Sequence, residues 1–272
     1  MADLKKLETE LKLRGFSQRT IKAYLYHNQK FLEAVGKAPE LVVEDDVRTY
    51  MASLVADRKL APSSITLVKA ALRFYYDEVL GKNIVRVKTP KNPKRLPIVL
   101  TKAEVKQLIA AAGSRRDRLM LILLYSSGLR LSEAVNLKYE NIEPTNRIGW
   151  VRGGKGGKDR LFIVSNEFLK ELEKLSAKRE RAGYIFMGNK GEKINPRTVQ
   201  EIVKRTARLA GIKKDIHPHT LRHCFATHLL ESGVGIRQIQ ELLGHSNLQT
   251  TQIYTSVSTE ELKKIKSPLD SL

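Results

Sequence analysis

The chain has 272 residues, of which 42% are hydrophobic, and it carries a formal net charge of +20. Its length suits two domains with real cores, its longest apolar run (Leu119–Tyr125) is too short to span a membrane, and its N-terminal residues lack the apolar stretch of a signal peptide. A single cysteine excludes an intrachain disulfide and an all-cysteine metal site. We therefore expect a soluble, cytoplasmic protein with no membrane partner.

Both halves of the chain share the positive charge. Residues 1–95 carry a net charge of +8, and the remainder carries +12. Two basic domains favour a polyanion bound against both of them, and nucleic acid is the first candidate. The alternatives are a solvated basic surface and, less favoured, an anionic membrane, because no basic amphipathic helix stands alone in the sequence.

Residues 1–88 are expected to form a compact bundle of four short helices. Apolar residues recur there at helical spacing in four runs: Leu4–Leu13, Ile21–Val35, Val47–Leu54 and Ile65–Val79. Glycines or other turn-forming residues separate the runs, and Pro62 is suited to begin the fourth helix. No catalytic group is apparent in this segment, and its aromatic side chains are expected to lie in the core.

Residues 89–98 are expected to be an extended linker. Three prolines in the segment prevent a helix and leave a basic strap between the two domains. We predict that Lys91, Lys94 and Arg95 contact the phosphate backbone of DNA. A spacer with solvated charges is the alternative.

Residues 99–272 are expected to form a second, mainly helical domain with a small antiparallel sheet. Thr101 and Glu104 form a capping box that begins a helix, and a buried helix is expected around Leu119–Ser127, ending at Gly128. Two strands, Ile148–Arg152 and Arg160–Val164, flank a glycine-rich hairpin tip. Later helices are predicted at 196–210, His219–Ser232, Ile236–Leu243, Leu248–Thr255 and Glu260–Ile265.

Two segments of this domain place cations beside glycines. Arg130 follows a glycine break beside an apolar helix, and Glu133 could orient its guanidinium, although an ordinary Arg–Glu helix pair is the alternative. The hairpin tip carries Lys155 and Lys158, which could reach a ligand or simply belong to a polar turn. The tip lacks the Gly-Lys-Ser/Thr pattern of a Walker loop.

The segment His217–His228 holds four histidines and Cys224, which raises the question of zinc. The i, i+4 histidine pair of metalloproteases with its intervening glutamate is missing from the sequence, so we predict no metal. His219 and Arg222 lie three residues apart and share a helical face. A cation next to a proton-transfer group is suited to a phosphate.

The segment Leu243–Thr255 has Gly244 at the end of a predicted helix, then His245, and nine residues later Tyr254. Alone, Tyr254 would be interpreted as an ordinary core or surface tyrosine. With the other three segments it completes a cationic set that lacks the clustered carboxylates of two-metal nucleases. Such a set is suited to attack on a phosphodiester by a phenolic oxygen.

The motifs of the last two segments resemble those of tyrosine recombinases of the lambda-integrase superfamily. They are His-Thr-Leu-Arg-His-x-Phe-Ala-Thr-His-Leu-Leu, Leu-Leu-Gly-His-Ser and Thr-Thr-Gln-Ile-Tyr-Thr. They are most similar to the Xer branch, with its archaeal members as the nearest candidates, and the resemblance covers nearly the whole chain. It implies a SAM-like core-binding domain at 1–88 and an α-rich catalytic domain at 99–272.

The resemblance assigns catalysis to six residues: Arg130, Lys155, His219, Arg222, His245 and Tyr254. Tyr254 would attack the scissile phosphate and form a 3′-phosphotyrosyl bond, with His219 as the base and Lys155 as the acid for the leaving 5′-oxygen. The two arginines and His245 would stabilise the phosphate in the transition state, and Glu133 would support them. No cofactor and no metal are implied.

The resemblance also implies a role and an assembly. The role is site-specific recombination that resolves chromosome dimers at a dif-like site. The assembly is a homotetramer on two inverted-repeat sites of double-stranded DNA, held by the C-terminal tail, residues 256–272. The chain shows no additional arm-binding domain, which favours a compact Xer-type enzyme. A phage or mobile-element integrase, a type IB topoisomerase and an inactive DNA-binding protein remain as alternatives, and the six intact positions argue against the last.

Overall fold

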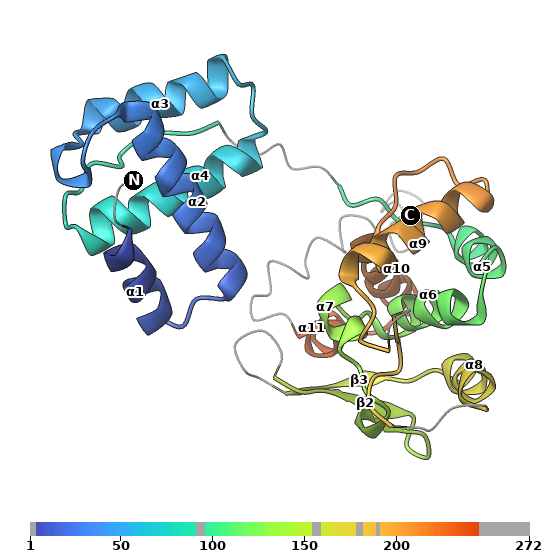
Figure 1. Cartoon of the computed structure of the whole chain (residues 1–272). Coiled ribbons are helices and arrows are strands. Elements are labelled where there is room, and N and C mark those ends of the chain that lie inside the picture. The colour runs from blue at the N-terminus through green and yellow to red at the C-terminus, as the bar shows by residue number, and fades with distance from the viewer. Residues whose placement is uncertain (1–3, 91–95, 154–158, 178–181, 189–190, 245–272) are drawn as a thin grey trace, which may run out of the picture. The chain divides into compact units, whose positions relative to one another are not determined.

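The computed structural model describes residues 4–90, 96–153, 159–177, 182–188 and 191–244 (Figure 1). The chain divides into two compact units, Met1–Lys94 and Arg95–Leu272. The linker residues Lys91, Lys94 and Arg95 and the two last predicted helices lie outside the described residues. In the part of the chain that is described, no helix is long and apolar enough to cross a membrane.

The first unit is a helical bundle, as predicted. Its helices are α1 (Lys5–Leu13), α2 (Gln18–Val35), the 3-10 helix η1 (Pro39–Leu41), α3 (Glu44–Ala56), α4 (Pro62–Arg73) and the π-helix η2 (Phe74–Val79). The fourth predicted helix therefore continues from α4 into a π-helical turn. Ser17 caps α2 by accepting a hydrogen bond from the Thr20 N–H at 3.2 Å, and Gly36 ends it with a left-handed φ of +68°.

The aromatic side chains of this unit lie mostly in its core, as expected. Phe31 is fully buried and packs edge-on against Tyr50 and Tyr76, with ring centroids 5.1 and 5.6 Å apart. Tyr26 is the exception, because more than half of its surface is exposed. Edge-on ring pairs contribute packing energy beyond the area that they bury, so this aromatic cluster stabilises the bundle.

The second unit is mainly helical with one small sheet (Figure 1). Its elements are α5 (Lys102–Ala110), α6 (Arg115–Ser127), α7 (Leu131–Val135), the 3-10 helix η3 (Tyr139–Asn141), β1 (Ile142–Glu143), β2 (Ile148–Val151), β3 (Arg160–Ile163), α8 (Asn166–Ser176), α9 (Pro196–Leu209), α10 (Pro218–Glu231) and α11 (Ile236–Leu243). Helices α7 and α8 and strand β1 are not among the elements predicted from the sequence. The predicted apolar helix begins at Leu119, whereas in the structure Ser114 caps α6 at Arg115 by accepting the Asp117 N–H at 3.1 Å.

The sheet is antiparallel with the strand order β1-β2-β3, and its second hairpin is the predicted one. Trp150 pairs with Leu161, and Val151 pairs with Arg160, so Arg160 begins β3 at the base of the hairpin. A Cβ at Gly149 would lie 2.2 Å from the Phe162 ring, so only glycine allows the two strands to approach here.

Helix α6 is the central element of this unit. Its residues Leu119–Leu124 are almost completely buried, and the helix packs against α8 and α10. Asp117 is also buried and accepts a hydrogen bond from Arg205 of α9 at 2.8 Å, which satisfies its charge. Because α6 is packed on several sides, its position in the unit is fixed. The candidate site begins at its C-terminal end.

Candidate active site

The chain leaves α6 through a turn that only glycine can make. Gly128 has a left-handed φ of +60°, and a Cβ there would lie 2.4 Å from a ring carbon of Phe225 on α10. The turn makes Arg130 the N-cap residue of α7. It also presents the Gly128 carbonyl to the interior, where Arg222 Nη1 donates to it at 2.5 Å.

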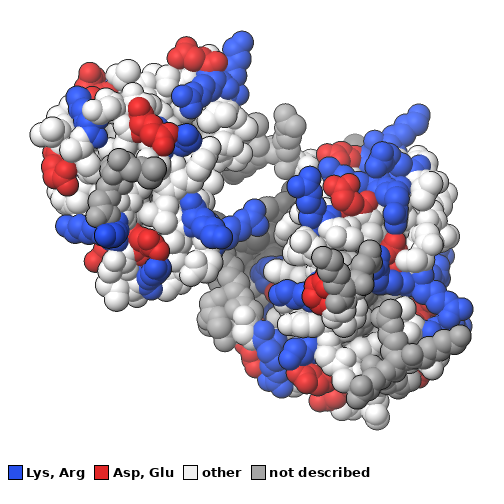
Figure 2. Space-filling view, viewed as in Figure 1, with Lys and Arg blue, Asp and Glu red and all other residues white. Residues whose placement is uncertain are grey.

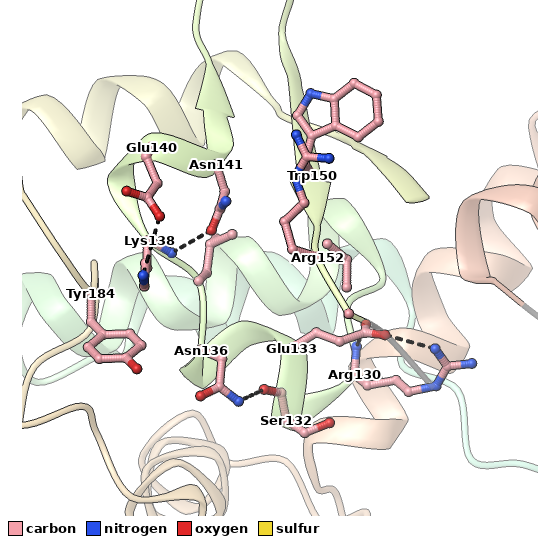
Figure 3. Close-up of a pocket in the computed structure, with 13 residues that line it drawn as sticks. Arg130, Ser132, Glu133, Asn136, Lys138, Glu140, Asn141, Trp150, Arg152 and Tyr184 are labelled. Atoms are coloured by element: carbon pink, nitrogen blue, oxygen red, sulfur yellow. Dashed lines mark hydrogen bonds and ion pairs between the residues drawn. The ribbon is translucent and has the colours of Figure 1, made fainter. Parts of the chain in front are cut away.

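Arg130 and Glu133 make the contact that the sequence suggested (Figure 3). The Arg130 guanidinium donates to Glu133 Oε1 at 2.8 Å, and the Arg130 backbone N–H donates to Oε2 at 2.7 Å. The Arg130 side chain is 24% exposed, whereas that of Glu133 is 7% exposed. The carboxylate therefore holds one side of the guanidinium and leaves another side open to a ligand.

Arg222 is the more deeply buried of the two predicted catalytic arginines. It lies on α10 with 3% of its surface exposed, and its guanidinium donates to the carbonyl of Gly128 and, at 2.7 Å, to that of Leu243. These carbonyls belong to the ends of α6 and α11, where a helix has acceptors without intrahelical partners. Two helix C-termini thereby stabilise a buried cation.

Arg130 and Arg222 meet at the C-terminus of α11. Arg130 Nη2 donates to the Gly244 carbonyl at 2.9 Å, next to the Leu243 carbonyl that Arg222 holds. The two residues come from different helices, α7 and α10, and are 92 positions apart in the sequence. The structure thus brings two guanidinium groups to the carbonyls of Leu243 and Gly244, the two residues that precede His245 in the sequence.

His219 lies one helical turn before Arg222 on α10. Partial burial, followed by the positive charges of Arg222, His217 and Arg130, lowers the pKa of His219 below its ordinary value. A lowered pKa keeps the imidazole neutral at neutral pH. A neutral imidazole can accept a proton, which is the property that a general base needs.

The structure describes four of the predicted site residues, namely Arg130, Glu133, His219 and Arg222. The others lie outside the described residues: Lys155, Lys158, His245 and Tyr254, together with Lys91, Lys94 and Arg95 of the linker. The roles of all these residues, described or not, remain predictions.

One further arginine lies at this site and was not predicted from the sequence. Arg160 was interpreted only as the first residue of a strand, yet its side chain is 12% exposed and Nη2 donates to Glu133 Oε2 at 2.6 Å. An arginine at the start of a strand is usually solvated, so composition and spacing could not reveal it. Its contacts with distant residues became visible only in the fold.

The histidine-rich segment does not assemble a metal site within the described residues, where no three His, Cys, Asp or Glu side chains are grouped for a metal. Cys224 is buried and accepts a hydrogen bond from the Leu100 N–H at 3.2 Å, and burial raises the pKa of its thiol to about 11. His228 Nδ1 lies 3.0 Å from the Tyr125 hydroxyl. These side chains connect α10 to its neighbours.

A cavity of about 630 Å³ opens beside Arg130 and Glu133 (Figure 3). Its wall continues along β2, where the Arg152 guanidinium lies 4.8 Å from the centre of the Trp150 ring. Lys138 adds a further cation to the lining. Cations and an aromatic ring next to the site are the groups that bind phosphates and bases of nucleic acid.

Comparisons with known proteins identify the family of the chain. The phage integrase family model matches residues 98–261, and the model of the phage integrase N-terminal SAM-like domain matches residues 4–85. The chain therefore belongs to the phage integrase family. Within it, the chain is a Xer-type, site-specific tyrosine recombinase, an enzyme that cuts and rejoins DNA.

Relatives over nearly the whole length support this assignment. Tyrosine recombinase XerA of Pyrococcus horikoshii is 43% identical, with 96% of this chain and 91% of the relative covered, and tyrosine recombinase XerD of Shewanella oneidensis is 37% identical, with 93% and 90% covered. A crystal structure of XerA recombinase aligns with a TM-score of 0.58 at 30% identity, covering 97% and 98%. XerH on palindromic difH substrate shares the fold, with a TM-score of 0.77 at 23% identity over 96% and 82%.

Proposed function

We propose that this recombinase resolves chromosome dimers at a dif-like site through a 3′-phosphotyrosyl intermediate. The observation that carries the chemistry is the meeting of Arg130 and Arg222 at the C-terminus of α11, with His219, whose pKa is lowered by burial and by these cations, on the same helix as Arg222. The relatives named XerA and XerD, and the XerH structure solved on difH substrate, support the role.

In the proposed reaction the Tyr254 oxygen forms a bond to the scissile phosphorus, and the bond from phosphorus to the 5′-oxygen breaks. His219 takes the proton of the phenol, whose ordinary pKa is about 10, and Lys155 gives a proton to the leaving oxygen. The phosphodiester bond energy is conserved in the intermediate. A 5′-hydroxyl from a second strand can then reverse the reaction without ATP.

The arginines are suited to hold the non-bridging oxygens, where negative charge develops in the transition state. The side-chain hydrogen bonds of Arg130 to described residues use two of the five N–H donors of a guanidinium. The remaining donors can face a phosphate, because the side chain is partly exposed. His245 would donate a further hydrogen bond to the same phosphate.

Double-stranded DNA is the proposed partner of both units. Figure 2 shows groups of lysine and arginine side chains on each unit. In the second unit, the cavity beside Arg130 is suited to the backbone near the scissile phosphate, with Lys138 and Arg152 as cations. Lys91, Lys94, Arg95 and Lys158 are proposed as further backbone contacts.

The decisive test is a nicked duplex from which the cleaved end diffuses away, so that a covalent adduct accumulates. The site is first selected from random duplexes, and we expect it to be an inverted repeat. We expect the adduct to form on this site with EDTA present throughout, because the arginines supply the positive charge that a metal would otherwise supply. No adduct would indicate an inactive DNA-binding protein. Relaxation of supercoiled DNA without exchange between two sites would indicate a topoisomerase.

The hairpin lysines can be distinguished by a substrate with a bridging 5′-sulfur at the scissile position. Sulfur leaves with little protonation, so this substrate should restore most of the cleavage that Lys155→Ala loses. Lys158→Ala is the matched control, because it removes a neighbouring lysine that we assign to backbone binding. The opposite pattern, with rescue of Lys158→Ala alone, would assign the acid to Lys158.

We propose that the C-terminal tail holds a tetramer together on two DNA sites. Its predicted helix Glu260–Ile265 has few apolar residues and too few turns to be stable alone, so it either docks on a surface or frays. We propose docking on the neighbouring subunit; docking on its own domain and a loose tail are the alternatives. A head-to-tail contact between neighbouring subunits can close into a ring. Deletion of residues 259–272 should weaken pairing of two sites, measured by native gel shift, and leave binding to one site intact. Full recombination by the truncated chain would contradict this assembly.

A further inference from the structure

Arg160 holds two parts of the candidate active site at once. Nη2 donates to Glu133 Oε2 at 2.6 Å, and Nη1 donates to the carbonyl of Leu242 at 2.8 Å. Glu133 is the carboxylate that also accepts from the Arg130 guanidinium, and Leu242 lies in the last turn of α11. Arg160 therefore connects Glu133, which holds the Arg130 guanidinium, to the C-terminus of α11, which Arg130 and Arg222 contact.

Each of the last four backbone carbonyls of α11 accepts a hydrogen bond from outside the helix or from its C-cap residue. The last four carbonyls of a helix have no intrahelical partner. The Gly244 N–H serves those of Gln240 and Glu241, Arg160 serves that of Leu242, and Arg222 serves that of Leu243. Two of the four therefore depend on arginines from other elements, β3 and α10, so the position of this helix end depends on both guanidinium groups.

The Glu133 carboxylate lies between the guanidinium groups of Arg130 and Arg160 and binds one of them with each oxygen. Oε1 accepts from Arg130 and Oε2 accepts from Arg160, while Oε2 also accepts the Arg130 backbone N–H. The buried Nε of Arg160 has no hydrogen-bond partner within the described residues, so Nη1 and Nη2 alone set the orientation of its guanidinium. If Arg160 were removed, Oε2 would lose a charged donor and the carboxylate could rotate away from Arg130.

Gly244 leaves the space that Arg160 occupies. A Cβ on Gly244 would lie 2.5 Å from Arg160 Cδ and 2.7 Å from Nε, and the glycine also has a left-handed φ of +62°. A methyl group there would displace the Arg160 side chain. The glycine is thus required both by the turn and by the arginine beside it.

We propose that Arg160 is a positioning residue for DNA cleavage, which acts by fixing Glu133 so that the Arg130 guanidinium faces the scissile phosphate. This inference rests on the proposed function. Because Arg160 acts through Glu133, its loss should reduce the rate of the chemical step and leave DNA binding largely unchanged. A side chain that merely stabilised the fold would not respond to the charge on the substrate.

The test compares Arg160→Met on two nicked substrates, one with a normal scissile phosphate and one with an uncharged methylphosphonate there. On the phosphate we expect single-turnover cleavage to fall on the order of 10- to 100-fold at saturating DNA, with the dissociation constant within about threefold. On the methylphosphonate the loss of cleavage should be at least about threefold smaller. Less negative charge develops on its non-bridging oxygen in the transition state, so the orientation of Arg130 matters less. Equal losses on both substrates, or no loss on the phosphate, would overturn the proposal.

Gly244→Ala provides a second route to the same displacement, with Gly233→Ala as its control. Gly233 has a left-handed φ of +84° with no atom within 4 Å of an added Cβ, so it shares the backbone strain and lacks the clash. We expect Gly244→Ala to slow cleavage and to add little to Arg160→Met in the double variant, and Gly233→Ala to keep the rate within about threefold. Equal effects of the two glycine variants would contradict the proposal. If the wild-type protein forms no adduct, the proposed function fails and the inference fails with it.

Discussion

Tyr254→Phe is expected to abolish covalent attachment to DNA, with cleavage reduced by at least about 10³-fold and DNA affinity within about threefold of wild type. The substitution removes the oxygen that forms the bond to phosphorus and keeps the aromatic ring. The measurement is adduct formation on a nicked substrate, read on a denaturing gel, beside a binding titration on intact DNA.

The matched control is Tyr139→Phe in the same unit. The Tyr139 hydroxyl lies 3.1 Å from Ser176 Oγ, so this substitution removes only a hydrogen bond between the two side chains. Its cleavage rate should stay within about threefold of wild type. An adduct formed by the Tyr254 variant would show that another side chain is the nucleophile, and peptide mapping of the adduct would identify it.

Arg222→Lys is expected to reduce single-turnover cleavage on the order of 10²- to 10³-fold. The lysine keeps the positive charge, but an ammonium cannot reproduce the planar fork that reaches the carbonyls of Gly128 and Leu243 and that, in the proposed reaction, would also face a phosphate. The end of α11 would then lose a donor in a buried position. We also expect a lower thermal unfolding midpoint for this variant, because a buried carbonyl is left unpaired.

Arg205→Lys separates loss of stability from loss of catalysis. Arg205 donates to the buried Asp117 at 2.8 Å and joins α9 to α6, away from the three arginines of the site. This variant should lower the unfolding midpoint too, yet cleave at nearly the wild-type rate at a temperature where both variants are folded. Equal losses of cleavage in the two variants would contradict a catalytic role for Arg222.

Much of the fold could be predicted from local sequence signals. Ser17, Pro62 and Thr101 begin helices in the structure because a cap or a proline acts within one turn of its own position. The missed elements include a five-residue helix, α7, and a two-residue strand, β1, which are too short to show a hydrophobic period. Helix α8 could have been found, since Ser165 caps an amphipathic run of eleven residues.

The chemical character of the site could also be predicted from the residue types in its short motifs. His219 and Arg222 lie three residues apart on one helix, so helical geometry places them on one face. Arg130 and Glu133 are also three residues apart, and the N-cap position of Arg130 brings the Glu133 carboxylate back to its backbone N–H. Their assignment to phosphate chemistry followed from their charge and from the resemblance. The positions of Lys155, His245 and Tyr254 are predictions on the same basis.

What the sequence by itself determined is therefore the local structure and the chemical character of the site, because caps, helical period and motif spacing act over a few residues. Only the tertiary structure placed Arg160 at the site, since its partners Glu133 and Leu242 are 27 and 82 positions away. The same is true of Arg130 and Gly244, which are 114 positions apart. Contacts of this kind depend on how β3, α7, α10 and α11 pack, and no local pattern specifies that packing.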